Sequence, residues 1–466
     1  METTNAGANP LQVAVVGGGP SGFYAAEALL KSGQAIDVDM IERLPTPYGL
    51  VRHGVAPDHP KLKEAILVYD KIARLPRFSL LGNVSVGHDV TVGELRAHYH
   101  ALVFACGAET DRRLGVPGDD LPGSHTATEF VGWYNGHPDY RDRSFDLSQE
   151  VAMIIGQGNV AADVARILAK SADELRHTDI AAHALDALAA SRIREIHVVG
   201  RRGPAQAKFT NKELRELGEL ANCEALVNPA DLQLNPESIA ELDPKTNPVG
   251  VKNVEILREF AARFPSGKPR RLVFHFLKGP LALEGATRLE QVILGHNRME
   301  GAPFQQVAQE TGEREALACG LLFRSIGYSG VAIEGIPFDV RKGVFPTRDG
   351  RIVDQAGAEM PGLYAAGWIK RGPSGIIGTN RADSVATVKS LLADLPRLAH
   401  EPKAGAAGLA PLLAGRGVRT VSFEDWLRID DREVALGQRH GKPREKFTRV
   451  AEMLACLAPS AASELD

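Results

Sequence analysis

The sequence has 466 residues, a formal net charge of −4, 44% hydrophobic residues and 24% charged residues. This length accommodates two or three domains with large apolar cores, and the slightly negative charge argues against a nucleic-acid-binding protein, which is normally basic. No apolar run is long enough to cross a bilayer, so we expect no membrane contact.

The first chemical motif is a glycine-rich loop, Gly17-x-Gly19-x-x-Gly22. It follows an apolar, strand-like run at 13–16 and opens into a helical pattern at 23–30. Glycine permits a tight turn there and lets the backbone approach a pyrophosphate at the helix N-terminus. The pattern predicts a dinucleotide-binding strand–turn–helix unit.

Glu42 ends the next strand-like run, 38–41, twenty residues after Gly22. A carboxylate at this point accepts hydrogen bonds from a ribose hydroxyl pair and repels a 2′-phosphate. The first site is therefore predicted to hold FAD or NAD. The alternative is that Glu42 is an ordinary solvated charge at a strand end.

A second glycine-rich loop, Gly156-x-Gly158-x-x-Ala161, lies about 140 residues later. It follows the apolar run 151–155 and precedes the helical pattern 161–169. A single loop of this kind is weak support for any function. Two of them, each between a strand and a helix, indicate a protein that holds two dinucleotides.

Two arginines take the place of the acid at the second site. The strand-like run 195–199 leads into Gly200-Arg201-Arg202-Gly203-Pro204, and guanidinium groups bind a phosphate by paired charge-assisted hydrogen bonds. This favours NADP over NAD. The separation of Ala161 from Arg201 is twice the usual one, and we attribute the excess to an alanine-rich, helical insert at 178–192. Alternatively, the two arginines are a plain solvated pair.

Strand-like runs ending in Gly107 and Gly367 flank the second loop. This order is explained by one dinucleotide domain that is split around an inserted one. We predict an α/β fold with two Rossmann-like, three-layer domains, the first from residues 1–108 and 332–466 and the second from 109–331.

The four cysteines are widely spaced and form no C-x-x-C motif. This argues against a disulfide scaffold, a zinc site and a redox-active cysteine pair, so we expect no metal and a reducing compartment. Residues 1–10 are too short and too uncharged for a targeting peptide. Residues 402–417 are expected to be a surface connection before a helix that starts at Ser422-x-x-Asp425.

Several longer motifs are more specific than the glycine loops: YGLVRHGVAPDHP (48–60), GQGNVAADVAR (156–166), GRRGP (200–204), KELRE (212–216) and GWIKRGPSGIIGTN (367–380). With GKPRE (441–445), they resemble the adrenodoxin reductase family of ferredoxin–NADP reductases over nearly the whole chain. His53 departs from the family pattern, which has an aromatic residue there. Trp368, in place of the aspartate of wider two-dinucleotide flavoproteins, is typical of the family.

The resemblance implies FAD in the split domain and NADP(H) in the inserted domain. The implied FAD contacts are Gly17, Gly19, Ser21, Gly22, Glu42, Leu50, Val86, Trp368, Gly375, Ile376 and Ile377. The implied NADP contacts are Gln157, Gly158, Asn159, Val160, Arg201, Arg202, Glu213 and Gly375. His59 and Glu213 are candidates for a place beside the nicotinamide. For His59, the alternative is a purely structural role in the turn 57–60.

The function that the resemblance implies is hydride transfer between NADPH and flavin N5, followed by one-electron transfer to a small iron–sulfur ferredoxin. Ferredoxins are acidic, so a basic rim would guide docking. The candidates are Arg215, Arg258, Arg263, Lys370 and Arg371, each of which is alternatively a plain solvated charge. We expect a monomer in the bacterial cytoplasm. The alternatives are an FAD- and NADPH-binding redox sensor or assembly subunit, and a flavin monooxygenase.

Overall fold

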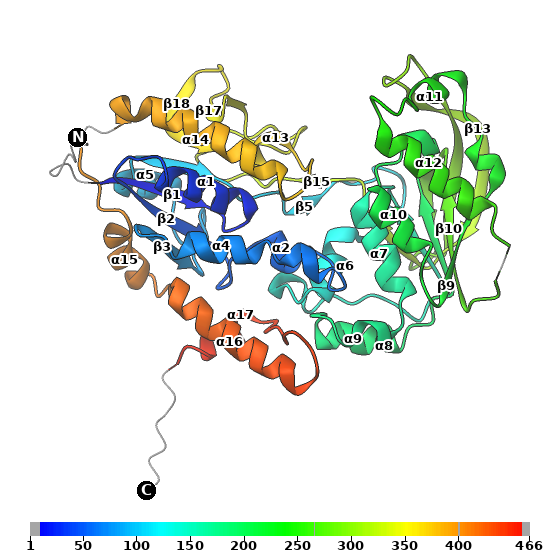
Figure 1. The fold of residues 1–466 in the computed structure, drawn as a ribbon, viewed down its shortest axis with the longest axis horizontal. Helices are drawn as coiled ribbons and strands as arrows, with labels where there is room; N and C mark the ends of the chain where they lie inside the picture. Colours follow the sequence, from blue (N-terminus) through cyan, green and yellow to red (C-terminus); the bar gives the residue numbers. More distant parts are fainter. Residues whose placement is uncertain (1–9, 265, 399–400, 459–466) are drawn as a thin grey trace, which may run out of the picture. The chain divides into compact units, whose positions relative to one another are not determined.

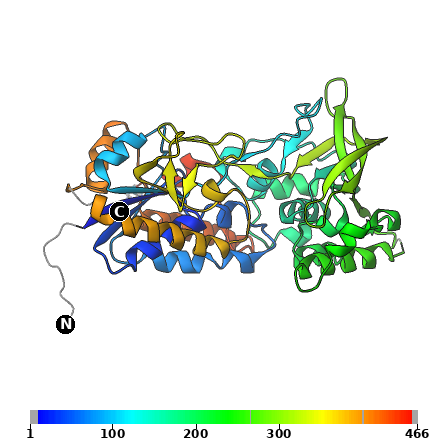
Figure 2. The same cartoon turned by 90° about the horizontal axis from the view of Figure 1, so that it is seen from above.

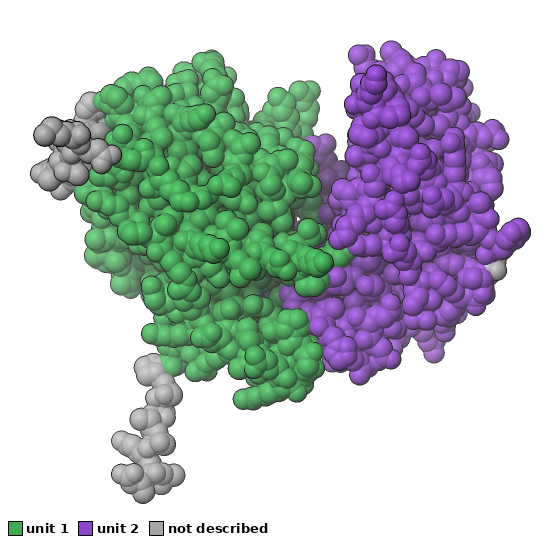
Figure 3. Space-filling model, viewed as in Figure 1, with its two compact units in different colours: residues 1–55, 59–110, 328–466 green, residues 56–58, 111–327 purple. Residues whose placement is uncertain are grey.

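The computed structural model describes residues 10–264, 266–398 and 401–458. The chain forms two compact units, shown in different colours in Figure 3. Unit 1 comprises residues 1–55, 59–110 and 328–466, and unit 2 comprises residues 56–58 and 111–327. The sequence predicts that the chain passes between the two domains near residues 108 and 332. In the structure the boundaries between the units lie at residues 110–111 and 327–328. The assignment of residues 56–58 to unit 2 has no counterpart in the sequence pattern.

Unit 1 is built on a seven-stranded sheet, and its strands are labelled in Figure 1 where there is room. The strands from β18 to β3 run parallel, whereas the edge strands β16 and β17 are antiparallel. In spatial order the strands are β16 (Thr347–Arg348), β17 (Arg351–Val353), β18 (Glu359–Ala365), β4 (Ala101–Phe104), β1 (Leu11–Val16), β2 (Ile36–Glu42) and β3 (Phe78–Gly82).

Alternating side chains along the strands build an apolar layer on each face of this sheet. Val13 and Val15 of β1 pack with helices α1, α4, α14 and α16, whereas Ala14 and Val16 pack with α5 and α15. In Figure 2, α1 and α14, which contact each other, lie together on one side of the sheet. The helices of unit 1 are α1 (Pro20–Leu30), α2 (Leu50–His53), α3 (Pro60–Lys63), α4 (Ile66–Ala73), α5 (Val92–His98), α13 (Trp368–Arg371), α14 (Thr379–Leu398), α15 (Ala406–Gly415), α16 (Phe423–Arg439) and α17 (Val450–Ala455).

Unit 2 contains a six-stranded parallel sheet and a three-stranded antiparallel sheet. The order in the first is β6 (Ser124–Thr126), β14 (Leu321–Arg324), β7 (Val151–Ile155), β8 (Glu195–Val199), β10 (Arg270–His275) and β9 (Cys223–Val227). The second consists of β11 (Lys278–Glu284), β12 (Gln291–Glu300) and β13 (Val307–Ala318). Short strands β5 (Thr110–Asp111) and β15 (Tyr328–Ser329) lie where the chain passes between the units.

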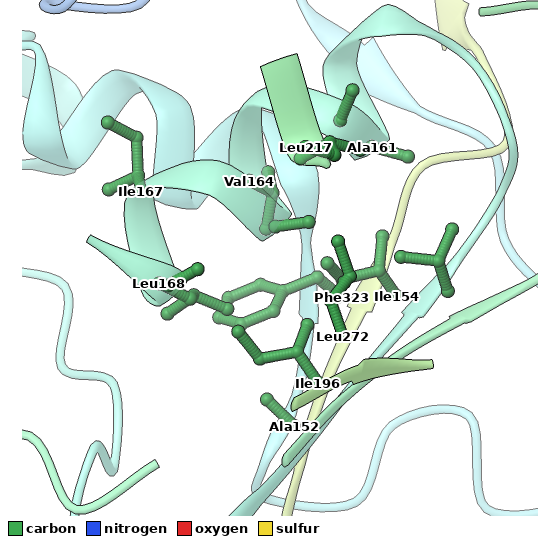
Figure 4. Packing of buried hydrophobic residues seen from close by; sticks show 14 of the residues in the cluster. Ala152, Ile154, Ala161, Val164, Ile167, Leu168, Ile196, Leu217, Leu272 and Phe323 are labelled. Carbon is green, nitrogen blue, oxygen red and sulfur yellow. The ribbon is translucent and has the colours of Figure 1, made fainter. Parts of the chain in front are cut away.

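The parallel sheet of unit 2 is covered by helices on one face and by the antiparallel sheet on the other. Ile154, Ile196 and Phe323 pack against α7, as Figure 4 shows for part of this cluster. Met153 and Leu322 face the opposite way, toward β11 and β12. The helices are α6 (Ala127–Tyr134), η1 (Pro138–Tyr140), α7 (Asn159–Ala169), α8 (Ala172–Leu175), α9 (Ala182–Ala189), η2 (Pro204–Gln206), α10 (Asn211–Leu217), η3 (Pro229–Leu232), α11 (Pro236–Ala240) and α12 (Pro248–Ala261).

The predicted fold class, two Rossmann-like α/β units with one inserted into the other, is confirmed. Helix α16 begins as predicted, with a capping box between Ser422 and Asp425. The expectation for 402–417 is wrong: this segment contains α15, which buries Leu409 and Leu413 against the sheet. Because the segment is rich in alanine and glycine, its apolar face could not be recognised from the sequence pattern. Residues 1–9, considered above for targeting, lie outside the described residues. Within the described part of the chain, no helix combines the length and apolarity that a membrane crossing requires.

Candidate functional site

The first glycine loop connects β1 to α1 in a conformation that requires glycine. Gly17 has a φ of +109°. A Cβ at Gly17 would lie 2.6 Å from the carbonyl oxygen of Ala105, and one at Gly22 would lie 2.0 Å from that of Gly17. Gly19 precedes α1 and faces open space, and no side chain caps the helix. The helix N-terminus is therefore a cradle whose free amides suit a pyrophosphate.

Glu42 is tied to the glycine loop by its own carboxylate. Its Oε2 accepts a hydrogen bond from the Gly18 amide at 2.7 Å, and its Oε1 accepts one from the Leu44 amide at 3.1 Å. Burial raises the pKa of the Glu42 carboxyl. Each carboxylate oxygen has a second lone pair for a ribose hydroxyl. Glu42 is thus a partly buried brace of the loop, and the picture of a freely solvated charge does not hold.

A strained turn after β2 packs against the same loop. Tyr48 has a φ of +86°, which is rare for a residue with a bulky side chain. Its amide donates to the carbonyl of Gly18 at 2.7 Å, and a Cβ on Gly49 would lie 3.1 Å from the Cα of Gly19. Leu50 follows with its side chain 39% exposed. This turn therefore places the exposed apolar side chain of Leu50 directly after Gly49, which contacts the glycine loop.

Ser21 links α1 to the segment that follows β18. Its hydroxyl donates to Oδ1 of Asn380 at 3.1 Å, and its carbonyl accepts from Ser384 at 2.9 Å. A Cβ on Gly367 would lie 2.1 Å from the hydroxyl oxygen of Ser21. Asp383 accepts the Gly367 amide at 2.6 Å. Asn380 and Asp383 were not predicted as site residues, although both lie in or just beyond the specific 367–380 motif.

The segment before α14 presents free polar groups beside exposed apolar side chains. Among the described residues, the backbone N–H groups of Ile376, Ile377 and Gly378 have no acceptor. Ile376 is 66% exposed, and Gly375 has a φ of +85°. The Trp368 ring stacks on Tyr328 at 5.4 Å, and its buried indole N–H has no partner in the described chain. These features suit a flat ligand with both apolar and hydrogen-bonding edges.

The second glycine loop repeats the first in its backbone. Gly156 has a φ of +137°, and a Cβ there would lie 2.1 Å from the carbonyl oxygen of Ser325. Gly158 precedes α7 with open space beside it and no side-chain cap. Ala161 is fully buried at the third position. Unit 2 therefore contains a second open helix N-terminus of the same kind.

The side chains of this loop are partly engaged by the protein itself. Gln157 Nε2 donates to the carbonyl of His275 at 2.9 Å, and Asn159 Oδ1 accepts the Thr210 amide at 2.8 Å. Val160 packs against the helical side of the core. These contacts fix the loop and show that Gln157 and Asn159 have structural roles besides the predicted cofactor contacts.

Arg201 and Arg202 leave β8 with both side chains exposed. Their backbone is anchored, because Asn297 Nδ2 donates to the Arg201 carbonyl at 3.2 Å and the Leu277 amide donates to that of Arg202 at 3.0 Å. Neither guanidinium has a salt-bridge or hydrogen-bond partner among the residues described. Two unpartnered cations on a fixed turn are suited to bind a phosphate.

Glu213 lies on α10 and is buried beside Arg166 of α7, with 3.4 Å between Oε2 and Nη1. Arg166, only 2% exposed, also pairs with Asp163 at 2.6 Å and with Asp58 at 2.7 Å. Burial opposes ionisation of Asp58, but Arg166 and Lys170 hold its pKa well below the usual range. Glu213 is therefore part of a charge cluster within unit 2.

Three other sequence candidates have simple positions within unit 1. His59 is buried and precedes α3, and its carbonyl accepts the Leu62 amide at 3.1 Å. Val86 lies in the turn after β3, against the α5 side of the core. The unusual His53 is buried, with Nε2 3.4 Å from Thr46 Oγ1. His59 and Glu213 belong to different units.

The predicted docking residues differ in how available they are. Arg215 and Arg258 are exposed. Arg263 is exposed but donates to the Gly218 carbonyl at 2.7 Å. Lys370 pairs with Asp383 at 2.7 Å, and Arg371 donates to Asn380 at 2.7 Å. Lys370 and Arg371 thus have internal roles in the 367–383 segment.

Comparison with known proteins agrees with this geometry. Residues 11–215 match the pyridine nucleotide-disulphide oxidoreductase family. The chain is 45% identical to NADPH-ferredoxin reductase FprA of Mycobacterium leprae, over 95% of this chain and 97% of the relative. It belongs to the adrenodoxin reductase family of ferredoxin–NADP reductases.

Two further relatives of the adrenodoxin reductase family extend the match. Human mitochondrial NADPH:adrenodoxin oxidoreductase is 44% identical, over 96% of this chain and 92% of the relative. The structure of Mycobacterium tuberculosis FprA in complex with NADPH superposes with a TM-score of 0.91 at 44% identity, covering 96% and 99% of the two chains. The resemblance predicted from the sequence motifs is confirmed. All four cysteines are free, in contrast to the disulphide in the name of the broader family.

Proposed function

We propose that this protein is an FAD-containing NADPH–ferredoxin reductase, with FAD held by unit 1 and NADP(H) by unit 2. The observation that carries the proposal is the pairing of two open glycine loops in one chain, one followed by an acid and the other by two unpartnered arginines. Full-length similarity to NADPH-dependent ferredoxin and adrenodoxin reductases supports it.

The residues of unit 1 fit FAD. The loop at Gly17–Gly22 would take the pyrophosphate, and Glu42 the ribose, for which it keeps free lone pairs. The ring system would be lined by Leu50, Trp368 and the 375–377 segment. The backbone N–H groups before α14, which have no hydrogen-bond acceptor among the described residues, would stabilise negative charge on it. When bound, FAD supplies the acceptance of a hydride and the release of single electrons.

The residues of unit 2 fit NADPH by the same reasoning. The loop at Gly156–Ala161 would take the pyrophosphate, and Arg201 and Arg202 the 2′-phosphate. Gln157, Asn159 and Val160 would shape the loop around the cofactor. Glu213, together with His59 and Gly375 of unit 1, remains a proposed neighbour of the nicotinamide. The role of the protein in the hydride step is chiefly to orient the two rings.

The relatives named above act on ferredoxin or adrenodoxin, so we propose an iron–sulfur protein as the electron acceptor. An acidic partner would dock on Arg215, Arg258 and Arg263, because these arginines are exposed whereas Lys370 and Arg371 serve unit 1 internally. A monomer in the bacterial cytoplasm stays part of the proposal, tested by light scattering and by cell fractionation.

Anaerobic titration tests the function directly. Purified protein should carry FAD, bleach rapidly with NADPH but slowly with NADH, and then reduce cytochrome c only when a ferredoxin is present. Slow bleaching by both nucleotides would indicate a sensor or assembly subunit. NADPH oxidation that depends on oxygen and an organic substrate would indicate a monooxygenase.

A further inference from the structure

Helix α16 begins 401 residues after Gly22, the last residue of the first glycine loop, yet its buried side chains reach the strained turn that packs on that loop. Trp426 Nε1 donates to the Tyr48 hydroxyl at 3.1 Å, and that hydroxyl in turn donates to Asp70. The Tyr48 ring is packed by Phe23, at 5.5 Å between centroids, and by Trp426 at 5.7 Å. The side chain of Tyr48 is therefore fixed at both its ring and its hydroxyl.

A buried ion pair holds the other end of the turn. Arg52, 3% exposed, donates to Oε1 of Glu433 at 2.6 Å, and Glu433 is fully buried. The guanidinium also lies over the Trp426 ring, 5.0 Å from its centroid. The Lys446 ammonium donates to the Arg52 carbonyl at 3.2 Å, and the Phe447 amide donates to Glu433 at 2.9 Å. Helix α16 and the residues after it thus grip the turn from Tyr48 to Arg52 on both sides.

A positive φ at a bulky residue persists only where the surroundings impose it. Tyr48 carries such a φ, and its amide bonds to Gly18 in the glycine loop. If the grip on Tyr48 and Arg52 is loosened, the turn is expected to relax, which would move Gly49 off Gly19 and Leu50 away from its exposed position.

We propose that Glu433 and Trp426 are positioning residues of the flavin site, acting through Arg52 and Tyr48 to hold the strained 48–50 turn against the glycine loop. This rests on the proposed binding of FAD by unit 1. It assigns a functional role to the 423–447 segment, which touches neither glycine loop directly in any contact described above.

The test uses the full-length protein purified with its FAD. Glu433→Gln removes the buried charge at constant shape, Trp426→Phe removes the N–H donor, and Tyr48→Phe removes the hydroxyl that receives it. Asp431→Asn is the matched control, because it removes a charge from the exposed face of the same helix. The measurements are the rate of FAD release, followed by flavin fluorescence after dilution, and the visible circular dichroism of bound flavin. Far-ultraviolet circular dichroism and NADP⁺ affinity report on the rest of the molecule.

Removing the carboxylate charge that faces the buried Arg52 guanidinium weakens a charge-assisted hydrogen bond and should speed FAD release about tenfold in Glu433→Gln, with a smaller rise in Trp426→Phe and Tyr48→Phe. The visible circular dichroism should change in all three, while NADP⁺ affinity stays as in the wild type. Wild-type release and dichroism in the folded variants would overturn the inference. So would failure of all three to fold while Asp431→Asn folds, because the role would then be core stability. Wild-type protein that binds no FAD would instead overturn the proposed function.

Discussion

The two glycine loops share a backbone but differ in what surrounds it. In both, the first glycine has a positive φ and packs on the carbonyl at the end of a neighbouring strand, Ala105 in one loop and Ser325 in the other. In both, the helix begins without a side-chain cap. The third position separates them: Gly22 leaves no room for a methyl group, whereas unit 2 accommodates Ala161.

The two loops differ more at the end of the next strand, which is β2 in unit 1 and β8 in unit 2. Glu42 accepts hydrogen bonds from the Gly18 amide of its own glycine loop and from the Leu44 amide, whereas the side chains of Arg201 and Arg202 are exposed and have no partner among the described residues. The glycine pattern builds the same backbone cradle in both units, and we propose that the residues at the end of the next strand select the nucleotide. The predictions below separate these two roles.

The largest effect is expected from Gly22→Ala. The added methyl group would meet the Gly17 carbonyl oxygen at 2.0 Å, and overpacking of this kind costs about 1–3 kcal/mol of folding free energy besides distorting the cradle. We expect protein that is purified without FAD, detected by its absorbance spectrum. Ala161→Gly is the matched change in unit 2 and should leave NADP⁺ affinity within about threefold of wild type. Equal retention of FAD by Gly22→Ala and wild type would contradict the steric argument.

The next largest effect concerns nucleotide choice. Replacing Arg201 and Arg202 together with alanine removes two charged donors, each contributing about 1.5 kcal/mol to phosphate binding after allowance for solvent exposure. The preference for NADPH over NADH should fall about 100-fold, measured as the ratio of kcat/KM values in a dye-reduction assay. FAD content should not change. An unaltered ratio would remove these arginines from the nucleotide site.

A smaller effect is expected from acid. His275, whose carbonyl holds Gln157, has Nε2 2.8 Å from Nδ1 of the buried His197. Burial, with the nearby His197 and Lys278, lowers the pKa of His275 from 6.5 to about 4. The folded state favours the neutral ring, so the stability it contributes is complete above pH 6.5 and is lost as the pH falls toward 4.

Acid should therefore weaken the NADP site through the histidine pair. Between pH 7 and pH 4, NADP⁺ affinity should fall more steeply than FAD retention in the wild type. The same divergence is expected in the control His88→Gln, which replaces an exposed histidine. The divergence should shrink in His275→Gln. Parallel loss of both ligands in all three proteins would argue against a role for the histidine pair.

The smallest effect concerns docking. Charge reversal of Arg215 and Arg258 to glutamate should slow ferredoxin-dependent cytochrome c reduction about tenfold at low salt, because exposed charges act mainly on the association rate. NADPH oxidation by a small dye should persist, and the defect should diminish as salt screens the surface. An equal fall in both reactions would mean that these arginines act inside unit 2 and not on the partner.

The sequence predicted well whatever depends on local pattern. The strands before both glycine loops, the helices after them and the capping box at Ser422 follow from periodicity and turn chemistry over a few residues. The insert before β8 was expected to be helical, and it contains α9. Helix α15 was missed because its apolar side chains are widely spaced among alanines and glycines.

Contacts between distant segments could not be predicted in the same way. The sequence indicated an acid at Glu42, but the amides of Gly18 and Leu44 that bind it depend on how the loop folds back. Asn380 reaches Ser21 because α14 packs against α1. Asp383 reaches the Gly367 amide because the chain between Gly367 and α14 folds back on itself. Likewise, the sequence alone does not distinguish Lys370 and Arg371 from surface charges, because their partners Asp383 and Asn380 are known only from the structure.

The strand order of unit 1 has a consequence for synthesis on the ribosome. Strand β4 pairs with β18, which begins at Glu359, after the whole of unit 2 has been translated. Until then β4 is an open edge, the kind of surface that pairs with other nascent chains. Because domains fold as units during translation, unit 2 can fold first. Unit 1 cannot complete its sheet until its last segment, residues 328–466, has been synthesised. The unpaired edge of β4 is therefore exposed for as long as unit 2 is being synthesised.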